Sequence, residues 1–332
     1  MLSENGELIF ITPRSFASGN YFKAFRELFF NTVQLQRIHL FNSRKETFDR
    51  DNVLQETVII KAIREKVDPL KKVIVSSSAG IKDIETPSIN SFYADELISL
   101  HSKEIILHLP TSNKEEKILN LISKWNSRLI DYDIYISTGP VVSFRAENYI
   151  ESVYQNGTVF LAPLFWLHNV NKMVLEWPKL FKEKGQYIRI EESSRSLLIP
   201  NKNYIFLRRF STKDDKSRLI AAPYFCNYYH SDVIGVENKV NYIYRKKGHL
   251  ERSETVGLCA LLNSELFDTY FRIFNGNVNV SATELREMRF PPISELKKTG
   301  NKIILSNDYS MTNVNHIVNE LFHLESILNE HE

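Results

Sequence analysis

The stretch LIFITPRSFASGNYFKAFRELFF, residues 8–30, constrains the fold of this chain more than any other feature. Residues 8–11 are a continuous apolar run, which is typical of a strand covered on both faces, and Pro13 ends it. A helix follows, with Tyr21, Phe25 and Phe29 at helical spacing on one face. A strand that leads through a loop into a helix places ligand groups at a sheet edge in α/β enzymes. The sequence therefore predicts an α/β fold from its first residues.

The rest of the chain predicts a division into three segments. Residues 33–41 and 53–60 resemble two further strands, joined by the polar loop NSRKETFDRDN, so that residues 1–66 are expected to form the trailing part of an open α/β sheet. Residues 67–112 are rich in Ser, Gly and Pro and predict a connector that contains one short strand. Short strands, turns and a few helices alternate over residues 113–332, which indicates a second α/β domain.

Composition excludes several classes of protein. Apolar residues make up 43% of the 332 residues, which is enough for packed cores. The two cysteines, Cys226 and Cys259, have neither disulfide-framework nor zinc spacing, so no metal is expected. The N-terminus does not resemble a signal peptide, and no apolar run is long enough to span a bilayer. We expect a cytoplasmic protein without a membrane partner.

A basic and aromatic segment predicts contact with nucleic acid. Residues 201–254 contain 11 Lys and Arg against 6 Asp and Glu, an excess of five positive charges, whereas the whole chain has a net charge of +2. Basic side chains neutralise phosphates, and Asn and Arg read base edges, so this composition suits a surface that faces double-stranded DNA. A solvated charged face around a sheet has the same composition, and each residue could instead be an ordinary surface or turn residue. The predicted contacts are Arg208, Arg209, Lys213, Lys216 and Arg218, with Asn238, Asn241 and Tyr242 for bases or sugars, and Lys239 and Asn277 as weaker candidates.

A magnesium nuclease is the alternative enzyme class. Asp232, Glu237 and Lys239 form an acid followed by Glu-x-Lys, a pattern that can hold a metal-activated water. Their spacing is very short for two strands to converge, and Glu-x-Lys is common by chance, so this alternative is the weaker one.

Seven blocks, in order along nearly the whole chain, resemble one protein family. They are FITPRSFASGNYFKAFR, IHLFNSRKETFDRDNVLQETVII, VVSFRAENYI, LLIPNKNYIFLRRFSTKDDKSRLIAAPY, ENKVNYIYR, GLCALLNSELFDTYFR and GNVNVSATELREMRFPP. Together they look like the C-terminal part of adenine-N6 DNA methyltransferases of restriction-modification systems, of the XhoI and TaqI type.

The resemblance implies a fold with separate domains for cofactor binding and for DNA recognition. In that family a doubly wound sheet binds S-adenosylmethionine, a target-recognition domain reads DNA, and the adenine is rotated out of the duplex between them. By this resemblance residues 1–66 are the end of the catalytic sheet, and Phe48 matches the aromatic residue that packs on the flipped base; a loop phenylalanine that merely covers the sheet edge is the alternative. The family's glycine-rich cofactor loop and its Asn-Pro-Pro-Tyr motif are absent from the printed sequence, where the only Pro-Pro pair is Pro291-Pro292.

Two interpretations follow. In the first, the chain recognises DNA and holds the base, and it needs a separate or missing N-terminal methyltransferase half, which binds S-adenosylmethionine, for activity; a cognate restriction endonuclease is a further expected partner. In the second, it is a stand-alone DNA-binding protein or an inactive remnant. The first predicts an exposed apolar sheet edge near residues 8–11, and the second predicts that this edge is covered.

Overall fold

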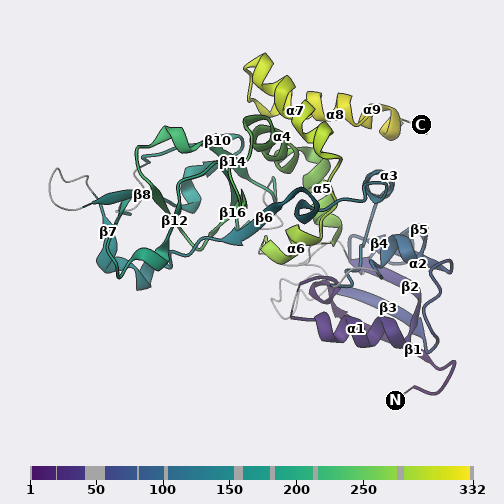
Figure 1. Ribbon diagram of the computed structural model, residues 1–332. Coiled ribbons are helices and arrows are strands. Elements are labelled where there is room, and N and C mark those ends of the chain that lie inside the picture. The colour runs from purple at the N-terminus through teal and green to yellow at the C-terminus, as the bar shows by residue number, and fades with distance from the viewer. Residues whose placement is uncertain are drawn as a thin grey trace. The chain divides into compact units, whose positions relative to one another are not determined.

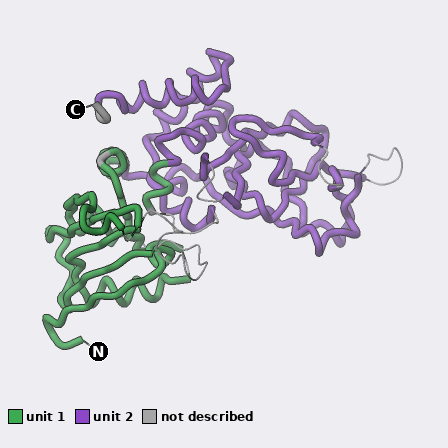
Figure 2. The backbone as a smooth tube through the Cα atoms, turned by 180° about the vertical axis from the view of Figure 1, so that it is seen from behind, with its two compact units in different colours: residues 1–124, 269–277 green, residues 125–268, 278–332 purple. Residues whose placement is uncertain are grey.

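The computed structural model describes residues 2–19, 21–41, 57–80, 82–100, 104–152, 160–179, 184–211, 216–274 and 280–329. The chain forms two compact units (Figure 2). Unit 1 comprises residues 1–124 and 269–277, and unit 2 comprises residues 125–268 and 278–332. Both contain helices and sheets, so the expected mixed α/β class is confirmed.

Unit 1 is built on a five-stranded mixed sheet with the order β1-β3-β2-β4-β5 (Figure 1). Strands β1, β2 and β4 run in one direction, because β3 is antiparallel to both β1 and β2, and β2 is parallel to β4. The strands are β1 (Glu7–Pro13), β2 (Gln34–Phe41), β3 (Thr57–Ile63), β4 (Lys72–Ser78) and β5 (Ser88–Tyr93), and the helices are η1 (Arg14–Ala17), α1 (Lys23–Thr32), α2 (Ala94–Leu97) and α3 (Asn113–Ser123).

Alternation of side chains along these strands produces one buried face. Leu35, Ile38 and Leu40 of β2 lie in the same core as Phe29 and Phe30 of α1, with apolar residues of β3 and β4 beside them. The expectation that β1 is covered on both faces is wrong, because Ile9 and Ile11 are 64% and 54% exposed. A continuous apolar run does not distinguish a two-faced strand from one that buries only alternate residues.

The predicted connector also needs correction. Residues 72–78 and 88–93 form β4 and β5, which pair with each other and extend the sheet from β2. Val73, Val75 and Phe92 bury their side chains in the core of unit 1. Serines at five of their thirteen positions, as printed in KVIVSSS and SINSFY, hide this strand pattern from a reading of composition.

Unit 2 contains two larger sheets and a group of helices. One sheet has the order β14-β13-β16-β6, and the other has the order β12-β15-β8-β11-β7. The strands are β6 (Ile134–Thr138), β7 (Ile150–Glu151), β8 (Leu161–Phe165), β9 (Val170–Asn171), β10 (Val174–Leu175), β11 (Tyr187–Arg189), β12 (Leu198–Pro200), β13 (Tyr204–Arg208), β14 (Ala221–Tyr224), β15 (Val233–Val236) and β16 (Val240–Arg245).

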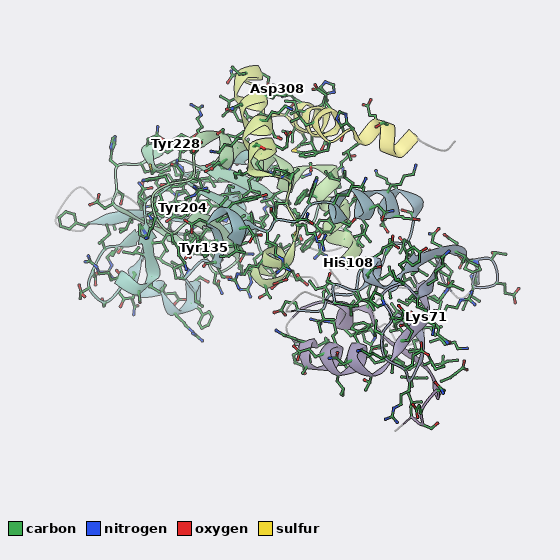
Figure 3. The ribbon with its side chains drawn as sticks, turned by 45° about the vertical axis from the view of Figure 1, so that its right-hand side comes forward. Lys71, His108, Tyr135, Tyr204, Tyr228 and Asp308 are labelled. Atoms are coloured by element: carbon green, nitrogen blue, oxygen red, sulfur yellow. The ribbon has the colours of Figure 1, made fainter. Side chains whose placement is uncertain are left out.

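Aromatic rings fill the core beside the β13 sheet. Tyr204, labelled in Figure 3, is 2% exposed and its ring lies 6.0 Å from that of Phe206, which in turn contacts Tyr224 at 5.3 Å. Burial raises the pKa of both tyrosine hydroxyls above the usual range, so both stay protonated. They serve as packing groups and as neutral hydrogen-bond donors to Pro200 O and Asn201 Oδ1.

The helices of unit 2 pack through glycine at one crossing. A Cβ on Gly257 of α4 would lie 1.9 Å from Leu296 O of α7, and one on Gly300 of α7 would lie 2.0 Å from Ser253 O of α4. Only glycine permits this backbone approach.

The helices that begin in unit 2 are α4 (Arg252–Asn263), α5 (Glu265–Phe274), α6 (Ala282–Glu287), α7 (Ile293–Ser306), α8 (Met311–Leu321) and α9 (Leu324–Asn329). Residues 269–274 of α5 belong to unit 1. The short 3-10 turns are η3 (Leu129–Tyr132), η4 (Ser143–Arg145), η5 (Glu147–Tyr149), η6 (Leu167–Asn169), η7 (Arg195–Leu197) and η8 (Cys226–Tyr228).

Candidate nucleic-acid interface

Three of the predicted DNA contacts meet at one turn of unit 2. The Arg209 backbone N–H donates to Lys239 O at 2.9 Å, and Arg209 Nη1 donates to Asn238 O at 3.1 Å. The turn between β15 and β16 thereby lies against the residue that follows β13. Lys239 is exposed and its Nζ lies 3.9 Å from Glu237 Oε1, a weak ion pair that leaves the ammonium accessible.

A second loop lies against the same turn and was not identified from the sequence. The Val141 N–H donates to Val236 O at 3.0 Å, and the Asn238 N–H donates to Val141 O at 2.8 Å. Gly139 is required in this loop, since a Cβ there would lie 2.2 Å from Glu237 O.

The loop continues into η4, where Phe144 is 69% exposed and the Arg145 guanidinium lies 5.3 Å from its ring. Phe210 beside Arg209 is also exposed, at 40%. We call this set the basic–aromatic patch: Phe144, Arg145, Arg209, Phe210, Asn238 and Lys239. The signal that could have found Phe144 and Arg145 is the Phe-Arg pair in the quoted block VVSFRAENYI, which follows Gly139-Pro140 in the sequence.

Other predicted DNA contacts are instead buried or half-buried and bond to other residues within the fold. Arg218 is 1% exposed, and Asn241 is fully buried, where it accepts from Thr138 Oγ1 at 3.0 Å and donates to Val280 O at 2.9 Å. Their burial is inconsistent with direct contact to DNA. Arg208 is half-buried and donates to Val170 O and Asn171 Oδ1, and Tyr242 is half-buried against Tyr204.

The remaining predicted residues fall in two groups. Lys216 is exposed. Phe48, Lys213 and Asn277 lie outside the described residues.

The alternative magnesium site does not form. Glu237 is fully buried, and its carboxylate accepts from the Leu167 N–H at 3.0 Å and lies 3.5 Å from Lys184 Nζ. Asp232 is exposed, and its backbone carbonyl accepts from Asn201. Among the described residues no cluster of His, Cys, Asp and Glu could hold a metal ion.

In unit 1, polar side chains gather where the parallel strands end. β1, β2 and β4 all end at one edge of the sheet, the place where open α/β sheets hold ligands. His39 Nδ1 lies 2.9 Å from Ser76 Oγ, and His39 Nε2 lies 3.0 Å from Ser78 Oγ. Burial lowers the pKa of His39, the charge of Arg37 lowers it further, and Asp83 opposes both. Residues 42–56, which follow β2 in the sequence and contain Phe48, lie outside the described residues.

The loop after β4 is closed by Asp83. Its carboxylate accepts from the Ala79 N–H at 2.7 Å and from the Gly80 N–H at 2.8 Å, and these bonds lower its pKa below the usual range. Asp83 and His39 therefore have their bonding atoms engaged within the edge itself.

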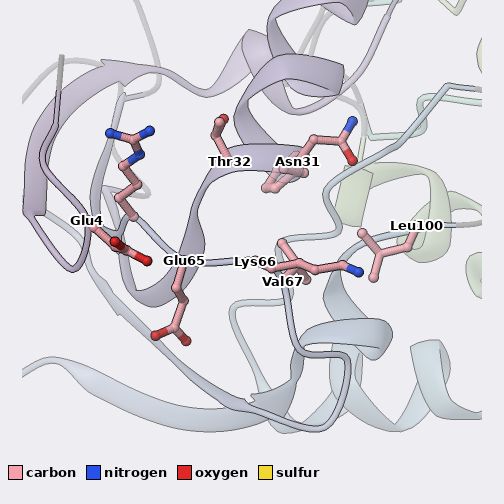
Figure 4. A pocket seen from close by; sticks show the side chains of 9 residues that line it. Glu4, Asn31, Thr32, Glu65, Lys66, Val67 and Leu100 are labelled. Atoms are coloured by element: carbon pink, nitrogen blue, oxygen red, sulfur yellow. The ribbon is translucent and has the colours of Figure 1, made fainter.

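A separate hollow of about 750 Å³ lies at the other end of the sheet (Figure 4). Thr32 at the end of α1 and Arg64 after β3 line it, together with Glu4, Glu65 and Lys66. Acidic and basic side chains both line it, and it is on the side where the parallel strands begin. It does not coincide with the ligand edge of the sheet.

Comparisons with known proteins identify similar sequences. No protein-family model matches the chain. The chain is 33% identical over 323 residues to the Type II methyltransferase M.PstI of Providencia stuartii, a match that covers 97% of this chain and 62% of that protein. It is 35% identical over 307 residues to the Type II methyltransferase M.BsuBI of Bacillus subtilis, covering 92% of this chain and 59% of that protein. The chain thus spans about three fifths of the length of these relatives.

Solved structures show weaker similarity. The Type IIL restriction-modification enzyme MmeI in complex with DNA matches with a TM-score of 0.45 and 11% identity, over 97% of this chain and 46% of that one. The type IIG restriction endonuclease BpuSI matches with a TM-score of 0.39 and 11% identity, over 98% and 47%. TM-scores of this size do not establish a shared fold.

Within the described residues, no helix has the length and apolar character needed to cross a bilayer.

Proposed function

We propose that this chain is the DNA-recognition and base-holding part of a site-specific adenine-N6 DNA methyltransferase of a restriction-modification system. The observation that carries the proposal is the similarity to two Type II methyltransferases over at least 92% of the chain. The chain spans only 62% and 59% of them, and its sequence has neither the glycine-rich loop nor the Asn-Pro-Pro-Tyr motif. Methyl transfer accordingly needs a complementary N-terminal part.

The basic–aromatic patch is the proposed DNA contact. Arg209, Lys239 and Arg145 supply positive charge for phosphates, and the Asn238 amide can both donate to and accept from a base edge. Phe144 offers an exposed ring next to a guanidinium, a combination that stacks on bases. Lys213, Lys216 and Asn277 extend the proposal, whereas Arg218 and Asn241 are assigned to the framework.

The target adenine is proposed to be held at the edge where β1, β2 and β4 end. Its exocyclic amine is inaccessible inside the duplex, so the base must leave the stack. Phe48, in the segment after β2, is the proposed stacking residue. This edge would hold the adenine amine in position to attack the methyl group of the donor. The reaction of two separate molecules would then become a step within one complex, which lowers its entropic barrier.

S-adenosylmethionine would supply the electrophilic methyl group. The described residues at this edge do not fit the cofactor, because both Asp83 oxygens accept from backbone N–H groups and both His39 nitrogens face serine hydroxyls. We therefore assign the cofactor to the complementary part. Double-stranded DNA is the proposed partner of this chain, and a cognate restriction endonuclease would act on the same DNA.

The test of DNA binding compares two lysines of similar exposure. Lys239 and Lys298 are 50% and 56% exposed, and their ion pairs to Glu237 and Glu295 measure 3.9 and 3.7 Å. Affinity for a pool of random 30-base-pair duplexes is measured against salt concentration for Lys239→Ala and for the control Lys298→Ala. We expect Lys239→Ala to reduce the slope of log affinity against log salt by about 0.9, the value for one lost phosphate contact. Equal slopes for the two variants would remove Lys239 from the interface.

The stand-alone DNA-binding protein is the second candidate function. It predicts that the sheet edge near residues 8–11 is covered. In the structure β1 is a terminal strand with Ile9 and Ile11 exposed, which supports the first proposal over the second.

A further inference from the structure

We infer that Lys184 is a further DNA-phosphate contact of this chain, and that the buried carboxylate of Glu237 positions its ammonium group beside that of Lys239. This inference rests on the proposed function, in which Lys239 contacts DNA, and adds to it a residue outside the basic segment 201–254. All three residues belong to unit 2.

Two ammonium groups lie beside one carboxylate oxygen. Glu237 is fully buried, and its Oε1 lies 3.5 Å from Lys184 Nζ and 3.9 Å from Lys239 Nζ. Its other oxygen, Oε2, accepts from the Leu167 N–H at 3.0 Å, which fixes the orientation of the carboxylate. Both ammonium groups therefore lie next to the turn between β15 and β16, the turn that carries the proposed DNA contacts.

The charges of this cluster favour the binding of an anion. Two positive charges surround one negative charge, and the side chains of Lys184 and Lys239 are 29% and 50% exposed, whereas that of Glu237 is 1% exposed. At these distances the ion pairs are weak, and each ammonium has three N–H donors, so each keeps donors for another acceptor. The cluster thus presents positive charge to the solvent while its acid is buried.

Trp166 restricts the side chain of Lys184. The Lys184 Nζ lies 4.2 Å from the centre of the Trp166 ring, which is 2% exposed. Trp166 Nε1 donates to Gly185 O at 2.7 Å, so the residue after Lys184 is bound to the same ring. The cation–π contact and the ion pair to Glu237 limit the rotamers of Lys184 before DNA arrives, so less conformational entropy is lost on binding.

The cluster adjoins the basic–aromatic patch. Lys239 belongs to both, and its backbone carbonyl accepts from the Arg209 N–H at 2.9 Å. Phosphates follow one another at short, regular intervals along each DNA strand, so neighbouring cations can contact separate phosphates. Lys184, which lies in the segment before β11, extends the patch from Lys239 by one such contact.

The experiment compares two half-buried lysines that each pair with a buried glutamate. Lys184 is 29% exposed and lies 3.5 Å from Glu237, which is 1% exposed. Lys297 is 35% exposed and lies 3.4 Å from Glu254, which is 3% exposed. Affinity for the pool of random 30-base-pair duplexes is measured against salt concentration for Lys184→Met and for the control Lys297→Met. We expect Lys184→Met to reduce the slope of log affinity against log salt by about 0.9 and Lys297→Met to leave it unchanged. Equal slopes for the two variants would overturn the contact.

Glu237→Gln distinguishes positioning from simple charge repulsion. The amide has one oxygen in place of two, so it cannot both accept from the Leu167 N–H and present an oxygen to Lys184. We expect Glu237→Gln to abolish the contribution of Lys184, so that adding Lys184→Met causes no further change in slope, whereas the control Glu254→Gln leaves that contribution intact. If the carboxylate only repelled DNA, its neutralisation would raise affinity and preserve the contribution of Lys184, and this result would overturn the positioning role.

Thermal melts establish which variants fold. If Lys184→Met unfolds because the Glu237 carboxylate loses its nearer cation, Lys184→Met combined with Glu237→Gln removes both charges and keeps the net charge of the chain. This double variant should still lower the slope by about 0.9, and a wild-type slope would refute the inference. Lys239→Ala is measured in parallel. A normal loss for Lys239→Ala with none for Lys184→Met refutes only the new contact, whereas equal slopes for Lys239→Ala and Lys298→Ala count against the proposed function.

Discussion

At the scale of single residues, the hydrogen bonds of Ser76 and Ser78 determine how many protons the His39 ring must carry. Ser76 Oγ lies 3.3 Å from Ile38 O, and Ser78 Oγ lies 2.9 Å from Gly80 O, so both hydroxyls can donate to backbone carbonyls. If both do, both ring nitrogens of His39 must donate, which requires a protonated ring. Burial and Arg37 instead lower the pKa of His39 and favour the neutral ring. A neutral ring has one N–H, so at neutral pH one serine must turn its hydroxyl toward His39.

This conflict predicts a pH dependence of stability. Because the pKa of His39 is lower in the folded chain than in the unfolded chain, the unfolded state binds more protons between the two values. Stability is then complete above about pH 6.5, the usual histidine value, and falls as the pH decreases below it. His168 acts in the same direction, because burial lowers its pKa too. We expect the loss of melting temperature between pH 7 and 5.5 to be smaller for His39→Gln than for the wild type, and identical pH profiles would contradict this.

At the scale of elements, one buried arginine joins three segments of unit 1. Arg26 of α1 is fully buried; its Nε donates to Ile105 O at 2.8 Å, its Nη1 to Phe16 O at 3.0 Å and its Nη2 to Glu104 O at 2.8 Å. Arg26→Met would remove the donors and leave these carbonyls without them, so we expect a loss of about 3 kcal/mol in the free energy of unfolding, measured in urea. Lys23→Met is the control, because it breaks only the partly exposed ion pair to Glu104, with an expected cost below about 1 kcal/mol. An equal loss in the free energy of unfolding for the two variants would show that the Arg26 hydrogen bonds do not stabilise the packing of these three segments.

The same helix shows what the sequence could and could not predict. Its existence followed from apolar periodicity, but the predicted apolar face included Tyr21 and Phe25, which are 92% and 40% exposed. The face that packs against the sheet contains Arg26, Phe29 and Phe30. Periodicity treats an arginine as a polar residue, whereas tertiary carbonyls can accept from all of its nitrogens. A local motif is visible in the sequence as well, because Ser281 of the quoted block GNVNVSATELREMRFPP accepts from the Thr283 N–H at 3.2 Å and caps α6.

At the scale of the whole molecule, local signals were predictable and long-range ones were not. Arg209, Asn238 and Lys239 of the basic segment meet at the turn between β15 and β16. Which basic and amide residues become buried, as Arg218 and Asn241 do, depends on packing against distant segments. Phe144 and Arg145 lie about sixty residues or more before those three in the sequence, and only the pairing of residues 139–141 with residues 236–240 shows that their loop adjoins the turn.

The proposed division of a methyltransferase between two parts leads to the last prediction. If the cofactor site lies in the complementary part and the base and DNA are held here, neither part alone can bring the adenine amine to the methyl group. We expect transfer of labelled methyl from S-adenosylmethionine to unmethylated DNA only when this chain is mixed with its complement, taken from the reading frame just upstream or from the relatives' unmatched segment. Phe48→Ala in the mixture should then reduce transfer more than it reduces DNA affinity. Activity of this chain by itself would refute the division, and an inactive mixture that still binds DNA would favour the stand-alone DNA-binding protein or an inactive remnant.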